Sequence, residues 1–425
     1  MFHVRFGFIA VKIEVIVRFF TGVIVFAALF ISCSGNRTAE IWTDRPEFAI
    51  YAEFFNTVQN QYKVSIRYHE NPAEGLQLSN DIPDAVVASW LKNSLTSVNF
   101  KTIDNLLTLK NFSIDDFYPK LLEIGKIDKN QYLLPVAFNI PALIFSKDKG
   151  RELSNSFTVD FSEIKKLSKS YNVETRGAYT RMGFSPLWND NFLMTAAVLS
   201  GVSFKEALPL AWDSAALDNS INYIYSWTRE INTNSQAEED FTFKYFFEPP
   251  EKLILSGRIL FSYMESSDIF TLSPEVKSNL DFRWITEQNK VPLMEDIVFL
   301  GIPKKSKSQK AARAFILWFF KIENQRQLLE YSRANRINEN IFGICGGFSS
   351  LGPVTEQIFP RFYPELLGRM PPSEYFMPPN ILPGNWADIK ERVVLPYLNE
   401  VARKRTTGET YPLERRLFDW MRIYR

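Results

Sequence analysis

Short apolar runs and amphipathic stretches alternate along the first part of the chain. Residues 40–42 predict a strand, and residues 43–46 contain a helix-capping residue followed by a proline, which is typical of a helix start. Apolar side chains recur at helical spacing over residues 48–58, and apolar and polar side chains alternate over residues 64–68. This strand–helix–strand unit indicates a parallel pair of strands.

Three further apolar runs have the character of strands. The run at residues 85–88 follows a proline and suits a strand that is buried on both faces. The runs at residues 133–137 and 142–145 are separated by a short break that contains Asn139 and a proline. Two extended runs joined in this way predict a crossover between two halves of the protein.

The second half of the chain is mainly helical in its pattern. Residues 349–386 are rich in proline and aromatic residues, which indicates loops that pack against the rest of the protein. The other predicted elements are helices within residues 158–235, strands at 259–261 and 298–303, one long helix over 307–332, and helices over 386–424.

Length and charge narrow the class of protein. A chain of 425 residues is too long for one ordinary core, so we expect two lobes. The formal net charge is +1, with both signs interspersed. A nucleic-acid-binding protein would show a basic stripe, so we expect no nucleic-acid partner. We also predict that the protein is a monomer.

Histidine and cysteine are too scarce for most catalytic or metal-binding sites. The chain has two histidines, His3 and His69, and two cysteines, Cys33 and Cys345. This excludes a histidine-rich metal site, and a structural zinc site would need paired cysteines. We therefore predict no catalytic residue, no metal and no cofactor. Glycoside hydrolysis needs only two carboxylates, so histidine scarcity leaves that chemistry open.

The N-terminal sequence predicts an export signal peptide. Basic residues punctuate the first eighteen positions, and the uncharged stretch at residues 19–32 is too short to span a bilayer but suits the core of a signal peptide. Ser32 and Cys33 resemble the lipobox of bacterial lipoproteins, although Phe30 stands where leucine is usual. The resemblance implies a signal peptide at 1–32, lipidation at Cys33 and a tether at 33–38. An uncleaved anchor is the alternative, and a disulfide between Cys33 and Cys345 is a further possible use of the cysteine.

An ordered series of segments resembles the maltose-binding-protein-like extracellular solute-binding proteins, family 1, of ABC importers. No single motif is specific to this family. The resemblance rests on the order in which the segments occur along the chain. The segments are Ile41-Trp42-Thr43-Asp44, residues 81–87, Tyr132-Leu133-Leu134-Pro135, residues 143–148, Thr158-Val159-Asp160-Phe161, residues 256–261 and residues 311–319.

The resemblance implies an α/β protein with the two-lobed, type II periplasmic-binding-protein-like fold. Crossover segments join the lobes, and the ligand lies in the cleft between them. The implied division is 39–139 and 291–343 for lobe 1, and 140–290 and 344–425 for lobe 2. The implied partners are a small polar solute, an ABC permease and, through the lipid anchor, the membrane, which places the protein outside the cytoplasm.

Candidate ligand contacts follow from a general rule. In open parallel sheets, ligands bind outside the carboxyl ends of strands. The rule and the resemblance point to the same segments, with Trp188 added as an aromatic residue of lobe 2. The predicted ligand-binding residues are Asp44, Arg45, Ser89, Trp90, Asn139, Trp188, Tyr263, Met264 and Glu265.

This mixture of side chains suits a carbohydrate. Aromatic rings such as Trp90, Tyr263 and Trp188 would stack on the C–H faces of a sugar, and Asp44 and Arg45 would bind its hydroxyls. Each aromatic residue could equally be part of the core, Asp44 could be only a helix cap, and Arg45 could pair only with a neighbouring acid. Two other functions remain open: a surface lipoprotein of the same fold that binds a protein partner, and an exported carbohydrate-active hydrolase.

Overall fold

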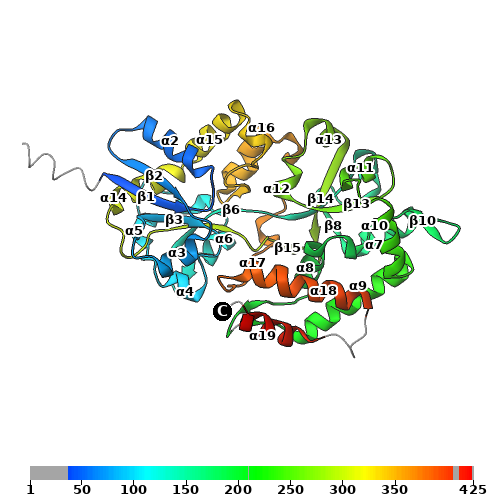
Figure 1. The fold of residues 1–425 in the computed structure, drawn as a ribbon. Coiled ribbons are helices and arrows are strands. Elements are labelled where there is room, and N and C mark those ends of the chain that lie inside the picture. Colours follow the sequence, from blue (N-terminus) through cyan, green and yellow to red (C-terminus); the bar gives the residue numbers. More distant parts are fainter. Residues whose placement is uncertain (1–36, 209, 405–410, 424–425) are drawn as a thin grey trace, which may run out of the picture.

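Two β-sheets organise the protein, and the computed structural model describes residues 37–208, 210–404 and 411–423 (Figure 1). The predicted signal peptide at 1–32 and the predicted lipidation at Cys33 lie outside the described residues. Each sheet is covered by helices, so the protein is a mixed α/β structure with two lobes, as predicted.

The larger sheet has six strands in the order β17-β6-β16-β3-β1-β2. The pair β1 and β2 is parallel, with Ile41 opposite Ile66, which confirms the predicted strand–helix–strand unit. The strand β16 is antiparallel to both β3 and β6. The six strands are β1 (Thr38–Thr43), β2 (Lys63–Tyr68), β3 (Ala85–Ala88), β6 (Leu133–Phe138), β16 (Val298–Gly301) and β17 (Phe348–Ser349).

The helices around the larger sheet come from two distant parts of the chain. Figure 1 shows α14 and α15, in yellow, among the blue elements of the N-terminal part, and α14 contacts β1. The elements are α2 (Phe48–Val58), α3 (Pro72–Leu78), α4 (Ser94–Ser97), α5 (Asp104–Leu107), η1 (Ile114–Asp116), α6 (Pro119–Ile124), α14 (Gln309–Phe319), α15 (Ile322–Ala334) and η4 (Ile337–Glu339), with a hairpin of β4 (Lys126–Ile127) and β5 (Asn130–Gln131).

The long helix predicted over residues 307–332 is wrong, because the chain breaks into α14 and α15. Lys321 has an extended backbone between the two helices. The Gln325 side chain donates a hydrogen bond to the carbonyl of Phe319, at the end of α14. A side chain of the second helix thus satisfies a terminal carbonyl of the first, which an apolar periodicity cannot reveal.

The smaller sheet has four strands in the order β13-β7-β14-β8. The strand predicted at residues 259–261 is misplaced, because β13 starts at Phe261 and continues to Glu265, paired with β7 along its length. The strands are β7 (Pro141–Ser146), β8 (Thr158–Asp160), β13 (Phe261–Glu265) and β14 (Leu280–Thr286).

The smaller half also carries the C-terminal helices, and α18 packs on α8 and α9 (Figure 1). Trp227 and Phe192 are fully buried in its core. The remaining elements are η2 (Lys147–Glu152), α7 (Phe161–Tyr171), β9 (Val173–Thr175), β10 (Ala178–Arg181), η3 (Pro186–Trp188), α8 (Asp190–Leu199), β11 (Lys205–Glu206), β12 (Leu210–Ala211), α9 (Ser214–Asn232), α10 (Ser235–Lys244), α11 (Pro250–Leu255), α12 (Ser266–Ile269), α13 (Pro274–Asn279), α17 (Trp386–Ile389), η8 (Lys390–Val394), α18 (Leu395–Lys404) and α19 (Leu413–Ile423).

Three connections join the halves. The first runs from β6 to β7, at the break predicted around Asn139. The second runs from β14 through β15 (Val291–Pro292) to β16, and the third runs from β17 to α17. The third passes through η5 (Val354–Ile358), α16 (Phe359–Phe362), η6 (Pro364–Leu366), η7 (Ser373–Tyr375) and β18 (Phe376–Met377).

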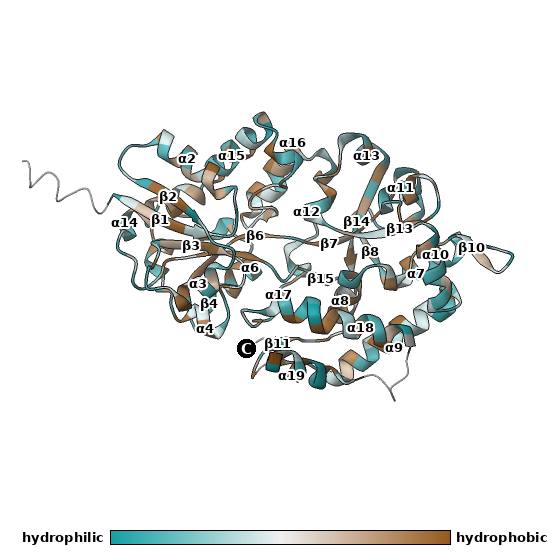
Figure 2. Ribbon diagram, viewed as in Figure 1, coloured by the Kyte–Doolittle hydropathy of each residue, from teal (hydrophilic) through white to brown (hydrophobic). Residues whose placement is uncertain are grey.

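The residue boundaries of the lobes stay a prediction. The strand β17 pairs with β6 in the larger sheet, although it lies beyond the expected boundary at residues 343–344. The strands β15 and β18 pair with each other, so the second and third connections run side by side. Figure 2 shows hydrophobic residues concentrated on the strands, while the outer helices mix hydrophobic and hydrophilic positions.

Candidate functional site

The loop after β1 brings two predicted residues toward a third. The strand β1 ends at Thr43, whose hydroxyl accepts a hydrogen bond from the backbone N–H of Arg45 at 3.0 Å. This turn directs the Arg45 guanidinium to Ser89, at the end of β3, where it donates a hydrogen bond of 2.7 Å. Asp44 lies 3.3 Å from the Arg45 Nε. The rule of strand ends therefore selected residues that the structure places together.

Asp296 completes this group from the second connection. The Ser89 hydroxyl donates to the Asp296 carbonyl at 2.7 Å, and the Asp296 carboxylate lies 4.0 Å from Arg45. The Asp296 side chain is about half exposed, with 46% of its surface accessible. Our sequence reasoning missed this residue. The only signal was a pair of acids immediately before a predicted strand, which is common at protein surfaces.

In this group, burial and the neighbouring charges shift the pKa values in opposite directions. Burial raises the pKa of Asp44, and the positive charge of Arg45 offsets only part of that effect. Burial alone would lower the pKa of Arg45, but Asp44 and Asp296 raise it overall, so the guanidinium stays charged. Asp44 Oδ1 and Arg45 Nε are buried and lie 3.3 Å apart as an ion pair, without a hydrogen bond to each other or to another described residue. Their contact is electrostatic, and the pair keeps hydrogen-bonding capacity for a polar group.

Charged residues of the smaller half face the same region. Glu265 stands at the end of β13, and burial, followed by the negative charge of Asp296, raises its pKa to about 7. Lys390 forms an ion pair of 2.9 Å with Glu295, and each side chain is only 12% exposed. We call Asp44, Arg45, Ser89, Glu265, Glu295, Asp296 and Lys390 the crossover cluster.

The crossover cluster can bind polar groups by hydrogen bonds and by charge. It combines carboxylates, a hydroxyl, a guanidinium and an ammonium, so it offers donors and acceptors to a hydroxylated solute. Beside it lies a mainly apolar cavity of about 220 Å³, which Glu295 and Lys390 also line. The other walls come from α8 and from the second and third connections.

Asn139 fastens the connections to one another. Its Nδ2 donates to the carbonyl of Gly346 at 3.1 Å, and its Oδ1 accepts from the hydroxyl of Ser266 at 2.6 Å. Its own carbonyl accepts from the backbone N–H of Met294 at 2.9 Å. The residue therefore lies at the crossover, as predicted, and it ties the first connection to the second and to the segment just before β17. Its contact with a ligand stays a prediction.

Trp90 lies between the larger sheet and a segment of the third connection, residues 377–384, which we call the proline-rich segment. The backbone of Trp90 is left-handed, with φ of 64°. Its side chain lines a cavity of about 30 Å³ together with Pro379 and Leu382. Sites for small molecules usually measure ~300 Å³ or more, so this cavity is too small for a sugar ring.

The proline-rich segment is held by the smaller half, and the two halves touch beside it. The Asn380 side chain donates to the hydroxyl of Ser203 at 3.0 Å, and the backbone N–H of Glu206 donates to the carbonyl of Ile381 at 2.7 Å. The hydroxyl of Ser94, from α4, donates to the Glu206 carboxylate at 2.9 Å. These contacts join loops of the two halves on the Trp90 side of the crossover.

Tyr263 and Met264 lie within β13 and not in a loop after it. Tyr263 is 5% exposed, and its ring packs edge-on against Phe192 at 6.2 Å. Its hydroxyl donates to the sulfur of Met294 at 3.8 Å, and burial raises its pKa well above the usual value. Met264 is half-buried and packs against a hydrophobic core cluster. Because the strand runs to Glu265, only that residue of the predicted trio reaches the crossover cluster.

Trp188 lies in a different part of the smaller half. Its ring stacks on Phe241 at 5.7 Å. It lines a pocket of about 690 Å³ with residues of α10 and α18, and no member of the crossover cluster lines that pocket. The structure therefore does not bring Trp188 together with the other predicted residues.

Among the described residues, His69 and Cys345 pack against other parts of the protein, which fits a structural role. His69 stacks on Trp42 with ring centroids 4.4 Å apart. Cys345 is 2% exposed, and burial raises the pKa of its thiol well above the usual value, which disfavours the reactive thiolate. Among the residues that the structure describes, no group of three or more His, Cys, Asp or Glu side chains is arranged to hold a metal ion.

Comparison with known proteins gives a family and a fold. The sequence profile of a family described as bacterial extracellular solute-binding protein matches residues 48–335. No curated protein matches the chain at a significant level.

Within residues 37–208, 210–404 and 411–423, none of the helices combines the length and apolarity needed to cross a membrane.

Several solved structures share the fold at low sequence identity. The sugar-binding protein MalE from the phytopathogen Xanthomonas citri has a TM-score of 0.62 and 12% identity, covering 91% of this chain and 96% of that chain. The cyclic α-maltosyl-1,6-maltose-binding protein from Arthrobacter globiformis has a TM-score of 0.60 and 14% identity, covering 90% and 97%. An ABC substrate-binding protein from Listeria monocytogenes in complex with cycloalternan has a TM-score of 0.59 and 14% identity, covering 91% and 98%.

These similarities agree with the two-lobed architecture. The profile spans more than half of the chain, and the solved structures match it over nearly its whole length. The protein therefore belongs to the bacterial extracellular solute-binding proteins.

Proposed function

We propose that the protein captures a saccharide between its two lobes and delivers it to an ABC permease. The family match supports solute binding. One solved protein of the same fold is named for cyclic α-maltosyl-1,6-maltose, and another has mannotriose bound, which supports a saccharide as the solute. Their identity to this chain is only 12–14%, so the choice of saccharide rests on the residues of this protein.

The observation that carries the proposal is the Asp44–Arg45 pair. Asp44 Oδ1 and Arg45 Nε face each other at 3.3 Å as an ion pair without a hydrogen bond, and the pair stands where β1 ends. A hydroxyl group can donate to Asp44 and accept from Arg45 at the same time. Saccharides present adjacent hydroxyls that can bind both side chains together.

Binding would stabilise a closed arrangement of the lobes. Asp44, Arg45 and Ser89 directly follow strands of the larger sheet, while Glu265 ends a strand of the smaller one. A solute that contacts both groups binds better when they approach, and that difference in affinity shifts the population toward the closed state. The closed form would then be the one that the permease recognises. This mechanism needs no covalent step.

The cluster also limits the charge of the solute. Its carboxylates are Asp44, Glu265, Glu295 and Asp296, and its cations are Arg45 and Lys390. An anionic solute would meet more negative than positive groups. We therefore propose an uncharged saccharide, with Trp90 reached only if the proline-rich segment moves.

A thermal-shift experiment on the full-length chain tests the function. Maltotriose or mannotriose should raise the melting temperature, because a ligand that binds only the folded state stabilises it. The substitution Arg45→Ala should abolish the shift, while Arg67→Ala, at an exposed ion pair with Glu40 and Asp81, should preserve it. Absence of a shift with every saccharide would reject the proposal, and consumption of the saccharide would favour the hydrolase alternative.

We further propose that Cys33 carries the lipid that holds the protein at the membrane, outside the cytoplasm. The proposal rests on the sequence, where Ser32 and Cys33 follow an uncharged stretch. The substitution Cys33→Ser should release the protein from the membrane fraction. Retention of the variant in that fraction would favour an uncleaved N-terminal anchor instead.

A further inference from the structure

A pocket of about 690 Å³ lies within the smaller half, away from the crossover cluster. Its walls come from η3, from the start of α8, and from α10 and α18. None of the lining residues belongs to the larger half or to the three connections. The lining residues are Leu187, Trp188, Asn189, Asp190, Gln236, Glu238, Glu239, Asp240, Thr242, Phe243, Phe246, Asn399 and Arg403. We call this the α10–α18 pocket.

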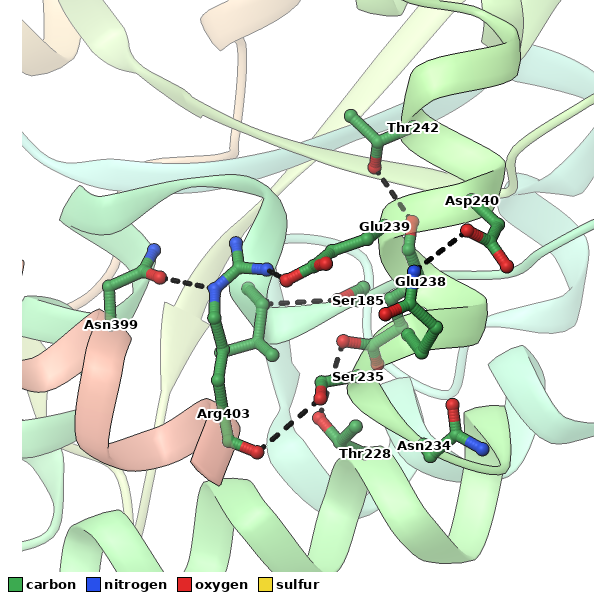
Figure 3. Close-up of polar contacts among 12 residues, drawn as sticks. Ser185, Thr228, Asn234, Ser235, Glu238, Glu239, Asp240, Thr242, Asn399 and Arg403 are labelled. Atoms are coloured by element: carbon green, nitrogen blue, oxygen red, sulfur yellow. Dashed lines mark hydrogen bonds and ion pairs between the residues drawn. The ribbon is translucent and has the colours of Figure 1, made fainter. Parts of the chain in front are cut away.

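One wall is a chain of planar polar side chains (Figure 3). The Arg403 guanidinium donates hydrogen bonds to the carboxylate of Glu239 and to the side-chain oxygen of Asn399. The Asn399 amide in turn donates to Asp190 at 2.6 Å. A guanidinium has five N–H donors and a carboxylate has about four acceptor positions, so these bonds use only part of the capacity of each group. The wall is fixed in position and retains donors and acceptors.

The floor is built around Glu238, which is 1% exposed. Its carboxyl group accepts hydrogen bonds from Asn232 at 2.6 Å and Thr228 at 3.4 Å, both on α9. Burial raises the pKa of Glu238 to about 7. On the other side, Arg403 accepts at its carbonyl from the hydroxyl of Ser235 at 3.3 Å, which ties α18 to α10 (Figure 3). The floor and the polar wall therefore form one rigid unit.

The rim carries aromatic rings that face solvent. Phe243 is 85% exposed and Phe246 is 70% exposed, although aromatic side chains of this size are usually buried. Trp188 forms a third aromatic surface of the pocket, held by its stacking on Phe241. Neighbouring exposed rings form an apolar patch, and patches of this kind mark binding surfaces.

We propose that the α10–α18 pocket is a second saccharide-binding site, for a neutral sugar unit. A sugar has C–H faces that pack on aromatic rings and hydroxyl edges that need planar polar partners. The pocket offers Phe243 and Phe246 for the first and the Arg403–Asn399 wall for the second. Its volume lies within the range of ~300–1,000 Å³ that is usual for small-molecule sites.

The charge of the lining excludes an acidic sugar. Asp190, Glu239 and Asp240 line the pocket, and Arg403 is the one lining residue with a cationic side chain. A uronic acid or a phosphorylated sugar would therefore be repelled. Neutral hydroxyls bind well to carboxylates, which are strong hydrogen-bond acceptors.

This site differs from the crossover site in its dependence on hinge motion. All its lining residues come from one half, so a sugar can bind without any change in the angle between the lobes. The proposal therefore does not rest on the proposed function.

Isothermal titration of the full-length chain with maltotriose, and separately with mannotriose, tests the proposal. The wild-type chain should bind one of these saccharides at two sites. Phe246→Ala, and independently Asn399→Ala, should weaken one site by about fivefold to tenfold, the effect of losing one aromatic stack or one polar contact. Phe418→Ala is the matched control, because Phe418 is 60% exposed on α19 and lies outside the lining, so binding should remain at the wild-type level.

Arg45→Ala separates the two sites. If Arg45→Ala removes one site and the pocket variants weaken the other, both proposals are supported. If Arg45→Ala removes all binding and the pocket variants match Phe418→Ala, the second site is rejected and the crossover site stands. If only the pocket variants lose binding, the crossover site is rejected. If neither saccharide binds the wild-type chain, both proposals are overturned. Unchanged melting temperatures would exclude unfolding as the cause.

Discussion

The crossover cluster and the α10–α18 pocket hold polar groups in different ways. The cluster takes Arg45 from the loop after β1, Asp296 from the second connection and Lys390 from the C-terminal part of the chain. The pocket takes its residues from one half and presents exposed phenylalanine rings. In the cluster, the nearby aromatic residues Trp90 and Tyr263 pack against the protein itself.

This difference separates a site that depends on the hinge from one that does not. When the lobes rotate about the connections, the distances between groups on different lobes change. The affinity of these groups for a solute therefore depends on the conformation. Groups within one half keep their spacing. Substitutions in the two regions should therefore differ in whether they change lobe closure or only local stability and binding.

The largest expected effect is on stability in the pocket region. The pKa of Glu238 is about 7 in the folded state and near 4.5 in the unfolded chain. The folded state therefore binds the proton more tightly, and stability falls as pH rises between these values, by about 3 kcal/mol in total. Glu238→Gln should remove this loss, because it cannot ionise.

Urea denaturation at about pH 5 and about pH 8 measures that effect. The difference in unfolding free energy between the two pH values should be smaller in Glu238→Gln than in the wild type. Glu53→Gln, at an exposed position on α2, should behave as the wild type does. An equal pH dependence in all three proteins would show that Glu238 titrates as an ordinary surface acid.

A smaller effect is expected for Lys390→Gln in the crossover cluster. This change leaves Glu295 buried without its ion-pair partner and removes the positive charge that lowers the pKa of Glu265. Since a raised acid pKa costs stability as pH rises, the variant should lose about 2 kcal/mol at pH 8 and less at pH 5. Chemical denaturation at both pH values provides the measurement. A loss that is the same at both would show that Lys390 does not control the ionisation of either Glu265 or Glu295.

Asp296→Asn should weaken the binding of the saccharide by about fivefold. The substitution keeps the backbone carbonyl that accepts from Ser89 but removes the charge beside Arg45. Titration calorimetry with the saccharide found by thermal shift measures the change, with Asp115→Asn, an exposed acid of η1, as the control. Affinity equal to that of the control would place Asp296 outside the binding site.

The smallest effect is expected for Trp90→Ala. In this arrangement the proline-rich segment covers the ring, so the affinity for a saccharide should change by less than about twofold. The same titration measures it. A loss of tenfold or more would show that the segment withdraws in the bound state and that Trp90 then stacks on the sugar.

Sequence reasoning succeeded where local pattern decides structure. The rule of strand ends selected Asp44, Arg45 and Ser89, and the structure connects them through one guanidinium. It failed for Asp296 and Lys390, because their places in the cluster depend on connections far along the chain. Each is an ordinary charged residue within its own segment, so no spacing or composition distinguishes it.

Aromatic residues show the same limit. Trp188 and Tyr263 are both predicted to stack on a sugar, yet one lines an open pocket and the other lies in the core. The position of Tyr263 was missed because β13 extends further than its apolar run. Strand length depends on pairing with β7, which is a long-range contact.

The sequence by itself determined the strands β1, β2, β3, β6 and β16 of the larger sheet, the likeness to solute-binding proteins and the strand ends that carry polar residues. These features follow from the period of apolar side chains and from short-range turn chemistry. Only the tertiary structure decided which charges meet at the crossover, which rings remain exposed and where the proline-rich segment lies. Those outcomes depend on contacts between residues that are distant in the chain, and such contacts leave no periodic signal in the sequence.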